Sequence, residues 1–177
     1  MFGTDGIRGE VNKFPITNDF VYKLAVALKL FKAKTKNILV GKDTRISGAF
    51  IEKALINGFK SVNVSCDFMG IVSTPMVSFY TKLLKYDFGI MISASHNQFQ
   101  DNGIKIFKKN GQKLSDFEEF KIEQKYELIK TKPKFLDLPV FYKDSYEKDY
   151  KDYILKKFKN KDFRKLKILI DSANGSV

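Results

Sequence analysis

The order of apolar patterns along the chain restricts its fold more than any other feature. Apolar side chains at helical spacing alternate with short runs that are typical of strands. The helical patterns cover residues 20–31, 48–58 and 74–84, and the strand-like runs cover residues 37–40, 62–68 and 88–92. Strands that alternate with helices predict an α/β sandwich with a mainly parallel sheet.

A further apolar run begins at Ile104, after a polar loop that is too short for a parallel crossover. We therefore expect the last two strands to pair antiparallel. The predicted fold class is a three-layer α/β/α sandwich with a mixed, mainly parallel sheet. Local signals support the helices and turns between these runs. They are helix caps at Thr17, Ser47 and Thr74, a turn at Asn110-Gly111, and a capping box over residues 115–118.

The last part of the chain has its own pattern. Residues 146–158 carry aromatic side chains at helical spacing, which predicts a packed helix. Residues 166–171 have the pattern of a strand, and a glycine-containing loop follows at the point where the chain stops. A lone strand cannot bury both of its faces. We therefore expect residues 1–160 to form one domain and residues 161–177 to begin a second domain that is truncated.

The charge of the chain leaves two interpretations open. Lys and Arg number 32 and Asp and Glu number 20, so the net charge is +12. A basic surface is typical of nucleic-acid binding. Acidic residues are interleaved with the lysines throughout, however, so we favour a lysine-rich solvated surface and no nucleic-acid partner. Such a surface suits small anionic substrates such as phosphates.

The chain has no pattern of secretion or membrane insertion. Its apolar share of 44% allows a proper core, and its one cysteine, Cys66, excludes a disulfide framework and a cysteine metal cluster. Residues 1–5 lack the basic start and apolar stretch of a signal peptide. No apolar run is long enough to cross a bilayer. We therefore expect a cytoplasmic protein with no membrane partner.

Three polar loops hold the side chains that could carry chemistry. Loops that follow the carboxyl ends of parallel strands converge on one edge of a sheet. Cations beside glycines and a hydroxyl suit a phosphorylated ligand, because the backbone can approach the phosphate closely there. The candidates are Arg8, Lys42, Arg45, Ser93, Ser95, His96, Asn97 and Lys105.

Each candidate also has an ordinary structural explanation. Arg8 could pair with Asp5, and Lys105 could point into solvent from its strand. Ser95 and His96 do not suggest a hydrolase triad, because neighbouring side chains on extended backbone point apart and the chain has one histidine. Composition and spacing alone therefore leave the roles of these side chains open.

Three motifs, in the same order and spacing, resemble the α-D-phosphohexomutase family. They are residues 2–9, residues 41–48, and residues 92–97 followed by residues 101–105. Residues 168–175 resemble the start of the second domain of the family, so the resemblance covers nearly the whole chain. It implies a first domain of the phosphoglucomutase type within a four-domain enzyme. The first and third motifs are most similar to members that interconvert glucosamine 6-phosphate and glucosamine 1-phosphate, for UDP-N-acetylglucosamine and cell-wall synthesis.

The resemblance also implies a role for each candidate. Ser95 matches the phosphoserine that carries the phosphoryl group through a bisphosphate intermediate. Lys105 matches the lysine of proton transfer, and Arg8 matches an arginine near the phosphoserine. His96 would act beside them. The side chains expected to bind substrate or steady its phosphate are Lys42, Arg45, Ser93 and Asn97.

The same resemblance implies Mg²⁺, one ion per active site, and a sugar 1,6-bisphosphate activator. The ion would contact the phosphate on Ser95, while its aspartate ligands belong to a second-domain motif that does not occur here. The family commonly has proline at the position of Gln98, so this loop is expected to be less stiff. We expect the chain alone to be inactive. The full-length protein could form a homodimer.

Three alternatives remain. One is a member of the same family that acts on phosphomannose or phosphoglucose, since sugar choice is read mainly by a third domain. The second is a basic nucleic-acid-binding domain, and the third is a phosphatase or other phosphoserine enzyme on an α/β scaffold. Substrate assays, salt-dependent DNA binding and phosphopeptide mapping of Ser95 distinguish them.

Overall fold

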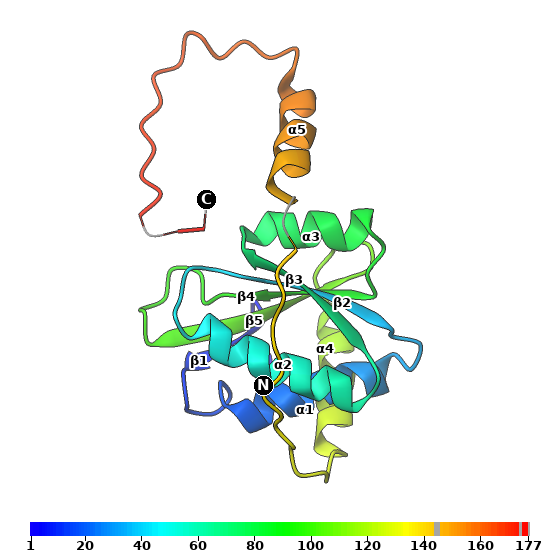
Figure 1. Ribbon diagram of the computed structural model, residues 1–177. Coiled ribbons are helices and arrows are strands. Elements are labelled where there is room, and N and C mark those ends of the chain that lie inside the picture. Colours follow the sequence, from blue (N-terminus) through cyan, green and yellow to red (C-terminus); the bar gives the residue numbers. More distant parts are fainter. Residues whose placement is uncertain (144–145, 174, 177) are drawn as a thin grey trace.

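The computed structural model describes residues 1–143, 146–173 and 175–176, and it is built around a five-stranded mixed sheet (Figure 1). The strands lie in the order β1 (Ile7–Glu10), β5 (Asp101–Lys108), β4 (Phe88–Ile92), β2 (Asn37–Lys42) and β3 (Ser65–Ile71). β2 pairs parallel with both β3 and β4, whereas β5 pairs antiparallel with both β4 and β1. Four of the strands therefore run in one direction and β5 runs against them.

Helices cover both faces of this sheet. α1 (Asn18–Phe31), α2 (Gly48–Ser61) and α4 (Asp116–Glu127) form one outer layer, and α3 (Thr74–Leu83) lies on the opposite face (Figure 1). α5 (Tyr146–Phe158) lies beyond α3 and contacts it through aromatic rings. The three-layer α/β/α sandwich and the antiparallel last pair of strands are confirmed.

Two apolar clusters hold the layers together. The larger one joins the sheet to α1, α2 and α4, and the smaller one joins it to α3. The helices α1 and α2 approach closely at Gly58, where an added Cβ would lie 2.4 Å from the carbonyl oxygen of Tyr22 and 2.8 Å from Cβ of Ala25. The contact therefore requires glycine for its lack of a side chain.

The four helices begin within one residue of the predicted caps, and the capping side chain is confirmed at two positions and wrong at two. The hydroxyl of Thr17 accepts from the N–H of Phe20 at 3.2 Å, and Ser115 forms the predicted capping box with Glu118. Ser47 precedes α2 but makes no cap hydrogen bond, because its hydroxyl accepts instead from the side chain of Asn102. Ser73, not Thr74, precedes α3.

Two strand predictions differ from the structure. β1 was expected to be loop, because its polar sequence has no apolar run; it adds to the sheet edge by pairing with β5. β3 begins at Ser65 rather than Val62, since residues 62–64 complete the turn after α2. Both differences arise from backbone pairing rather than from side-chain pattern.

The strand expected over residues 166–171 is not formed. Ile168, Leu169 and Ile170 are 68%, 98% and 81% exposed, and no strand among the described residues lies beside them to complete their hydrogen bonds. The assignment of residues 161–177 to a second domain stays a prediction. In the described part of the chain, no helix has the length and apolar character that a membrane crossing requires.

Candidate active site

The loop that follows β4 presents Ser95 to solvent at the carboxyl end of the parallel strands. This segment together with the first two residues of β5, residues 93–102, is called the Ser95 loop below. Ser95 is exposed and has a φ of 60°, which places its backbone in the left-handed region. Its N–H donates to the buried hydroxyl of Ser93 at 2.9 Å, and its own hydroxyl lies 3.5 Å from Nδ1 of His96. Ser93 therefore supports the turn that exposes Ser95.

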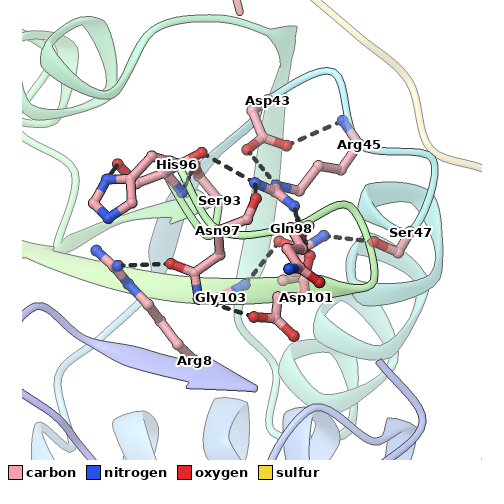
Figure 2. A network of polar contacts seen from close by, with 12 residues as sticks. Arg8, Asp43, Arg45, Ser47, Ser93, His96, Asn97, Gln98, Asp101 and Gly103 are labelled. Carbon is pink, nitrogen blue, oxygen red and sulfur yellow. Dashed lines mark hydrogen bonds and ion pairs between the residues drawn. The ribbon is translucent and has the colours of Figure 1, made fainter. Parts of the chain in front are cut away.

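Arg45 joins the loop after β2 to the Ser95 loop (Figure 2). A guanidinium has five N–H donors in a fixed planar array. The acceptors of Arg45 are Oδ2 of Asp43 and the carbonyl oxygens of Gln98, Asp101, Ser95 and Asn97, at 3.2, 2.6, 2.9, 3.0 and 2.7 Å respectively. All five donors are engaged within the protein.

A second set of side chains holds the base of the loop. Nδ2 of Asn97 donates to Oδ2 of Asp101 at 2.9 Å, and Oδ1 of Asn97 accepts from Nη1 of Arg8 at 3.3 Å. Asn102 is fully buried; its amide donates to Ser47 and its Oδ1 accepts from the N–H of Gly103. Figure 2 shows these contacts linking β1, the loop after β2 and the Ser95 loop.

Three cations gather on the carboxylate of Asp5. Nη2 of Arg8 lies 2.8 Å and Nζ of Lys105 lies 2.7 Å from Oδ2, and Lys113 pairs with Oδ1. The hydrogen bonds from Lys105 and then Lys113 hold the pKa of Asp5 far below its usual range. An open hollow of about 510 Å³, lined by residues 1–6 and Arg8, lies beside this carboxylate. The three cations outnumber the carboxylate, and one of them, Arg8, also contacts Asn97 of the Ser95 loop.

Lys42 has different partners from the other candidates and binds Glu52 and Tyr142. Its Nζ lies 2.6 Å from Oε2 of Glu52 and 2.7 Å from the hydroxyl of Tyr142. Burial acts to lower the pKa of Lys42, but the contacts with Glu52 and Tyr142 raise it, and the net direction is upward. The structure therefore places Lys42 in a largely buried ion pair with α2, whereas Arg8, Arg45, Asn97 and Ser93 all make hydrogen bonds within or to the Ser95 loop.

The residues present offer little to a metal ion. No group of three His, Cys, Asp or Glu side chains that could hold one occurs among residues 1–143, 146–173 and 175–176. The carboxylates of Asp5, Asp43 and Asp101 each already accept from a cation or amide.

Sequence reasoning missed several residues of the site. Lys113, Asp43 and Asp101 were not singled out, although both aspartates lie inside the motifs, and Asp5 was named only as a possible partner of Arg8. Lys113 is distant in sequence, and only the fold brings it to Asp5. The signal available in the sequence was the position of each aspartate within a few residues of a predicted cationic candidate.

Comparison with known proteins places the chain in a family. The family model described as "Phosphoglucomutase/phosphomannomutase, alpha/beta/alpha domain I" matches residues 1–133. Proteins named phosphoglucosamine mutase are 44% identical in Buchnera aphidicola subsp. Baizongia pistaciae, 42% in Bartonella henselae and 43% in Neisseria gonorrhoeae. Each match covers 99% of this chain and about 40% of the relative's length, 41% for the Neisseria protein.

Solved structures show the same fold. A protein assigned as a phosphomannomutase from Thermus thermophilus is 27% identical with a TM-score of 0.70, over 81% of this chain and 33% of that chain. A phosphoglucomutase/phosphomannomutase family protein from Burkholderia thailandensis is 18% identical with a TM-score of 0.67, over 90% and 36%. The chain therefore belongs to the phosphoglucomutase/phosphomannomutase family, and its residues 1–133 correspond to the α/β/α domain I of that family.

Proposed function

We propose that the complete protein containing this chain is a phosphoglucosamine mutase, which interconverts glucosamine 6-phosphate and glucosamine 1-phosphate. The observation that carries the proposal is the exposed left-handed turn at Ser95, with Arg8 and Lys105 gathered on Asp5 nearby. The identity of 42–44% with proteins of that name supports the choice of sugar. The product would feed UDP-N-acetylglucosamine and cell-wall synthesis.

The proposed reaction uses Ser95 as a phosphoryl carrier. The bond between Oγ of a phosphorylated Ser95 and phosphorus breaks while a sugar hydroxyl forms the new oxygen–phosphorus bond. The hydroxyl gives up its proton and the serine oxygen gains one. The sugar bisphosphate then turns over and returns its other phosphoryl group to Ser95. Serine serves this role because it forms a covalent intermediate that divides one transfer into two.

The cations supply what phosphoryl transfer most needs, which is position and charge stabilisation. Arg8 lies within reach of the Ser95 loop through Asn97, and its guanidinium favours the charge on the transferring oxygens. Lys105 donates to Asp5 and is the group proposed to exchange a proton with the sugar hydroxyl. His96 lies beside the serine hydroxyl and is proposed to assist at that oxygen.

Mg²⁺ and a sugar 1,6-bisphosphate activator are part of the proposal. The phosphate on Ser95 would contribute one oxygen ligand, and carboxylates outside this chain would contribute the rest. When bound, the ion would neutralise charge on the phosphate oxygens. We propose a cytoplasmic protein with a phosphosugar substrate and no nucleic-acid partner. Measuring the molar mass of the complete protein in solution would show whether it forms a homodimer.

A substrate panel with the complete protein tests the proposal. We expect turnover of glucosamine 6-phosphate to exceed that of mannose 1-phosphate and glucose 1-phosphate. Ser95→Ala should abolish turnover, whereas Ser61→Ala, at a surface turn of α2, should retain it. Intact-mass analysis should show one phosphoryl group, restored to Ser95 by the sugar 1,6-bisphosphate. The 177-residue chain alone, which spans about 40% of its relatives, should be inactive.

Two results would contradict the proposal. A preference for mannose 1-phosphate or glucose 1-phosphate would favour the same-family alternative, for which the similarity to a structure assigned as a phosphomannomutase argues. Turnover by the Ser95→Ala protein would remove Ser95 as the phosphoryl carrier.

A further inference from the structure

Arg45 is the side chain that connects the two polar loops of the site (Figure 2). We propose that Arg45 is a positioning residue: it holds the Ser95 loop in its working shape and does not bind the phosphate of the substrate. The catalytic part of this inference rests on the proposed function, whereas its structural part concerns the free chain and stands without it.

The N–H donors of Arg45 are all engaged by the protein itself. Nη1 and Nη2 donate to four carbonyl oxygens of the Ser95 loop at 2.6–3.0 Å, and Nε donates to Asp43. A guanidinium has no sixth N–H and no acceptor. A substrate phosphate would therefore have to displace a hydrogen bond that the protein already makes. Arg8 differs, because its hydrogen bonds to Asn97 and Asp5 engage two of its five N–H donors among the described residues.

The charge of Arg45 is offset by Asp43. Asp43 accepts from both the backbone N–H and Nε of Arg45, and the two side chains are only 13% and 12% exposed. The pair is therefore close to neutral toward the site, and Asp43 directs the guanidinium at the loop. Hydrogen bonds from an ionised donor in such a shielded place are about twice as strong as those between neutral groups.

The hydrogen bonds of Arg45 also orient the peptide groups of the Ser95 loop. The C=O and N–H of a trans peptide point in opposite directions. A carbonyl drawn to Arg45 therefore directs the following N–H, such as that of His96 after Ser95, away from the guanidinium. Figure 2 shows His96 and Arg45 on opposite sides of the loop. By holding these carbonyls, Arg45 presents the positive ends of the peptide dipoles to the side where an anion on Ser95 would lie.

Amide hydrogen exchange in the 177-residue chain tests directly whether Arg45 holds the Ser95 loop in shape. Arg45→Lys keeps the charge but has three donors on one point, so it cannot reach four carbonyls in a plane. We expect the amides of Ser95, Asn97 and Asp101 to exchange at least about tenfold faster in R45K, measured by NMR. The matched control is R164K, since Arg164 also contacts an aspartate but lies outside the site. If R45K does not fold, Asp43→Asn carries the same test.

The complete protein supplies the second readout. A misplaced Ser95 should lower kcat by about 100-fold in R45K and leave KM within about twofold. Unchanged amide exchange in R45K would overturn the inference, and so would a raised KM with unchanged kcat, which is the signature of a lost substrate contact. If wild-type protein turns over no phosphosugar, the proposed function fails, and amide exchange alone still decides the role of Arg45.

Discussion

Asp5 shows how one side chain shapes a site without reacting itself. Its two carboxylate oxygens accept from Arg8, Lys105 and Lys113, which would otherwise repel one another. The carboxylate therefore fixes the positions of cations that the proposed reaction needs near Ser95. It also explains why the candidates could not be judged singly from the sequence: Arg8 pairs with Asp5 and remains part of the site.

The ion pairs of Asp5 predict a pH-dependent stability. Its pKa is lowered in the folded chain, so the carboxylate stabilises the fold above its usual value of 3.8, and this stabilisation is lost as pH falls through the lowered pKa. Asp5→Asn should lower the free energy of unfolding by about 1 kcal/mol at pH 7. Urea titrations should show the difference from wild type shrinking below pH 3.8.

The control for that prediction is Glu10→Gln. Among the described residues, Glu10 forms an ion pair with Lys13 alone, and both side chains are well exposed, so the change should stay within about 0.5 kcal/mol. A wild-type advantage over D5N that grows on acidification would contradict the lowered pKa of Asp5.

At the scale of elements, β2 and α2 are joined by a buried ion pair. Glu52 lies on α2 and is 1% exposed; Oε2 accepts from Lys42 at the end of β2 and from Tyr142. Oε1 of Glu52 is buried without a hydrogen-bond partner in the part of the chain that the structure describes. The carboxylate therefore depends on its two partners, and the contact ties the segment around Tyr142 to the end of β2.

Removing the cation of this pair should be costly. Lys42→Met leaves the Glu52 carboxylate buried and unpaired, so we expect the free energy of unfolding to fall by about 3 kcal/mol in urea titrations. The double variant K42M/E52M should recover most of that loss, because both charges are then removed. Lys53→Met, on the exposed face of α2, should change stability by less than about 0.5 kcal/mol. Equal effects of K42M and K53M would show that the pair contributes nothing.

At the scale of the molecule, the chain divides into a packed part and an extended part. Residues 1–143 contain the sheet, four helices and nearly all of both apolar clusters. α5 buries no residue fully, although Tyr146 and Tyr150 contact the rings of Tyr80 and Phe79 on α3. Residues 159–173 are exposed throughout and lie away from the sandwich (Figure 1).

This division predicts the order of proteolysis. Exposed lysines and arginine in residues 159–167 should be the first sites of trypsin, because a protease needs an unfolded segment. A time course followed by mass spectrometry should show a long-lived product that retains residues 1–143. Digestion in urea, where the sandwich unfolds, is the control and should remove that product. Initial cleavage inside residues 1–143 would contradict the prediction.

Local pattern was enough for much of the fold. Helical spacing and caps such as Thr17 and the Ser115 capping box identified the helices, and the short loop before Ile104 identified the antiparallel pair. These features depend on neighbours in the sequence. β1 was not predicted, because an edge strand is formed by backbone pairing, which the side-chain pattern does not show. The strand predicted at residues 166–171 is not formed, because no partner strand for it occurs among the described residues.

The amino-acid sequence alone determined which side chains stand in the three polar loops, and its motifs pointed to Ser95. The tertiary structure alone decided which partner each of these side chains contacts. Arg45, expected to contact phosphate, directs its donors at carbonyls of the Ser95 loop, Lys42 turns to Glu52, and Lys113 reaches Asp5 from another element. The physical reason is that a charged group takes whichever partner the fold brings within hydrogen-bond distance, and that partner is seldom its neighbour in the sequence.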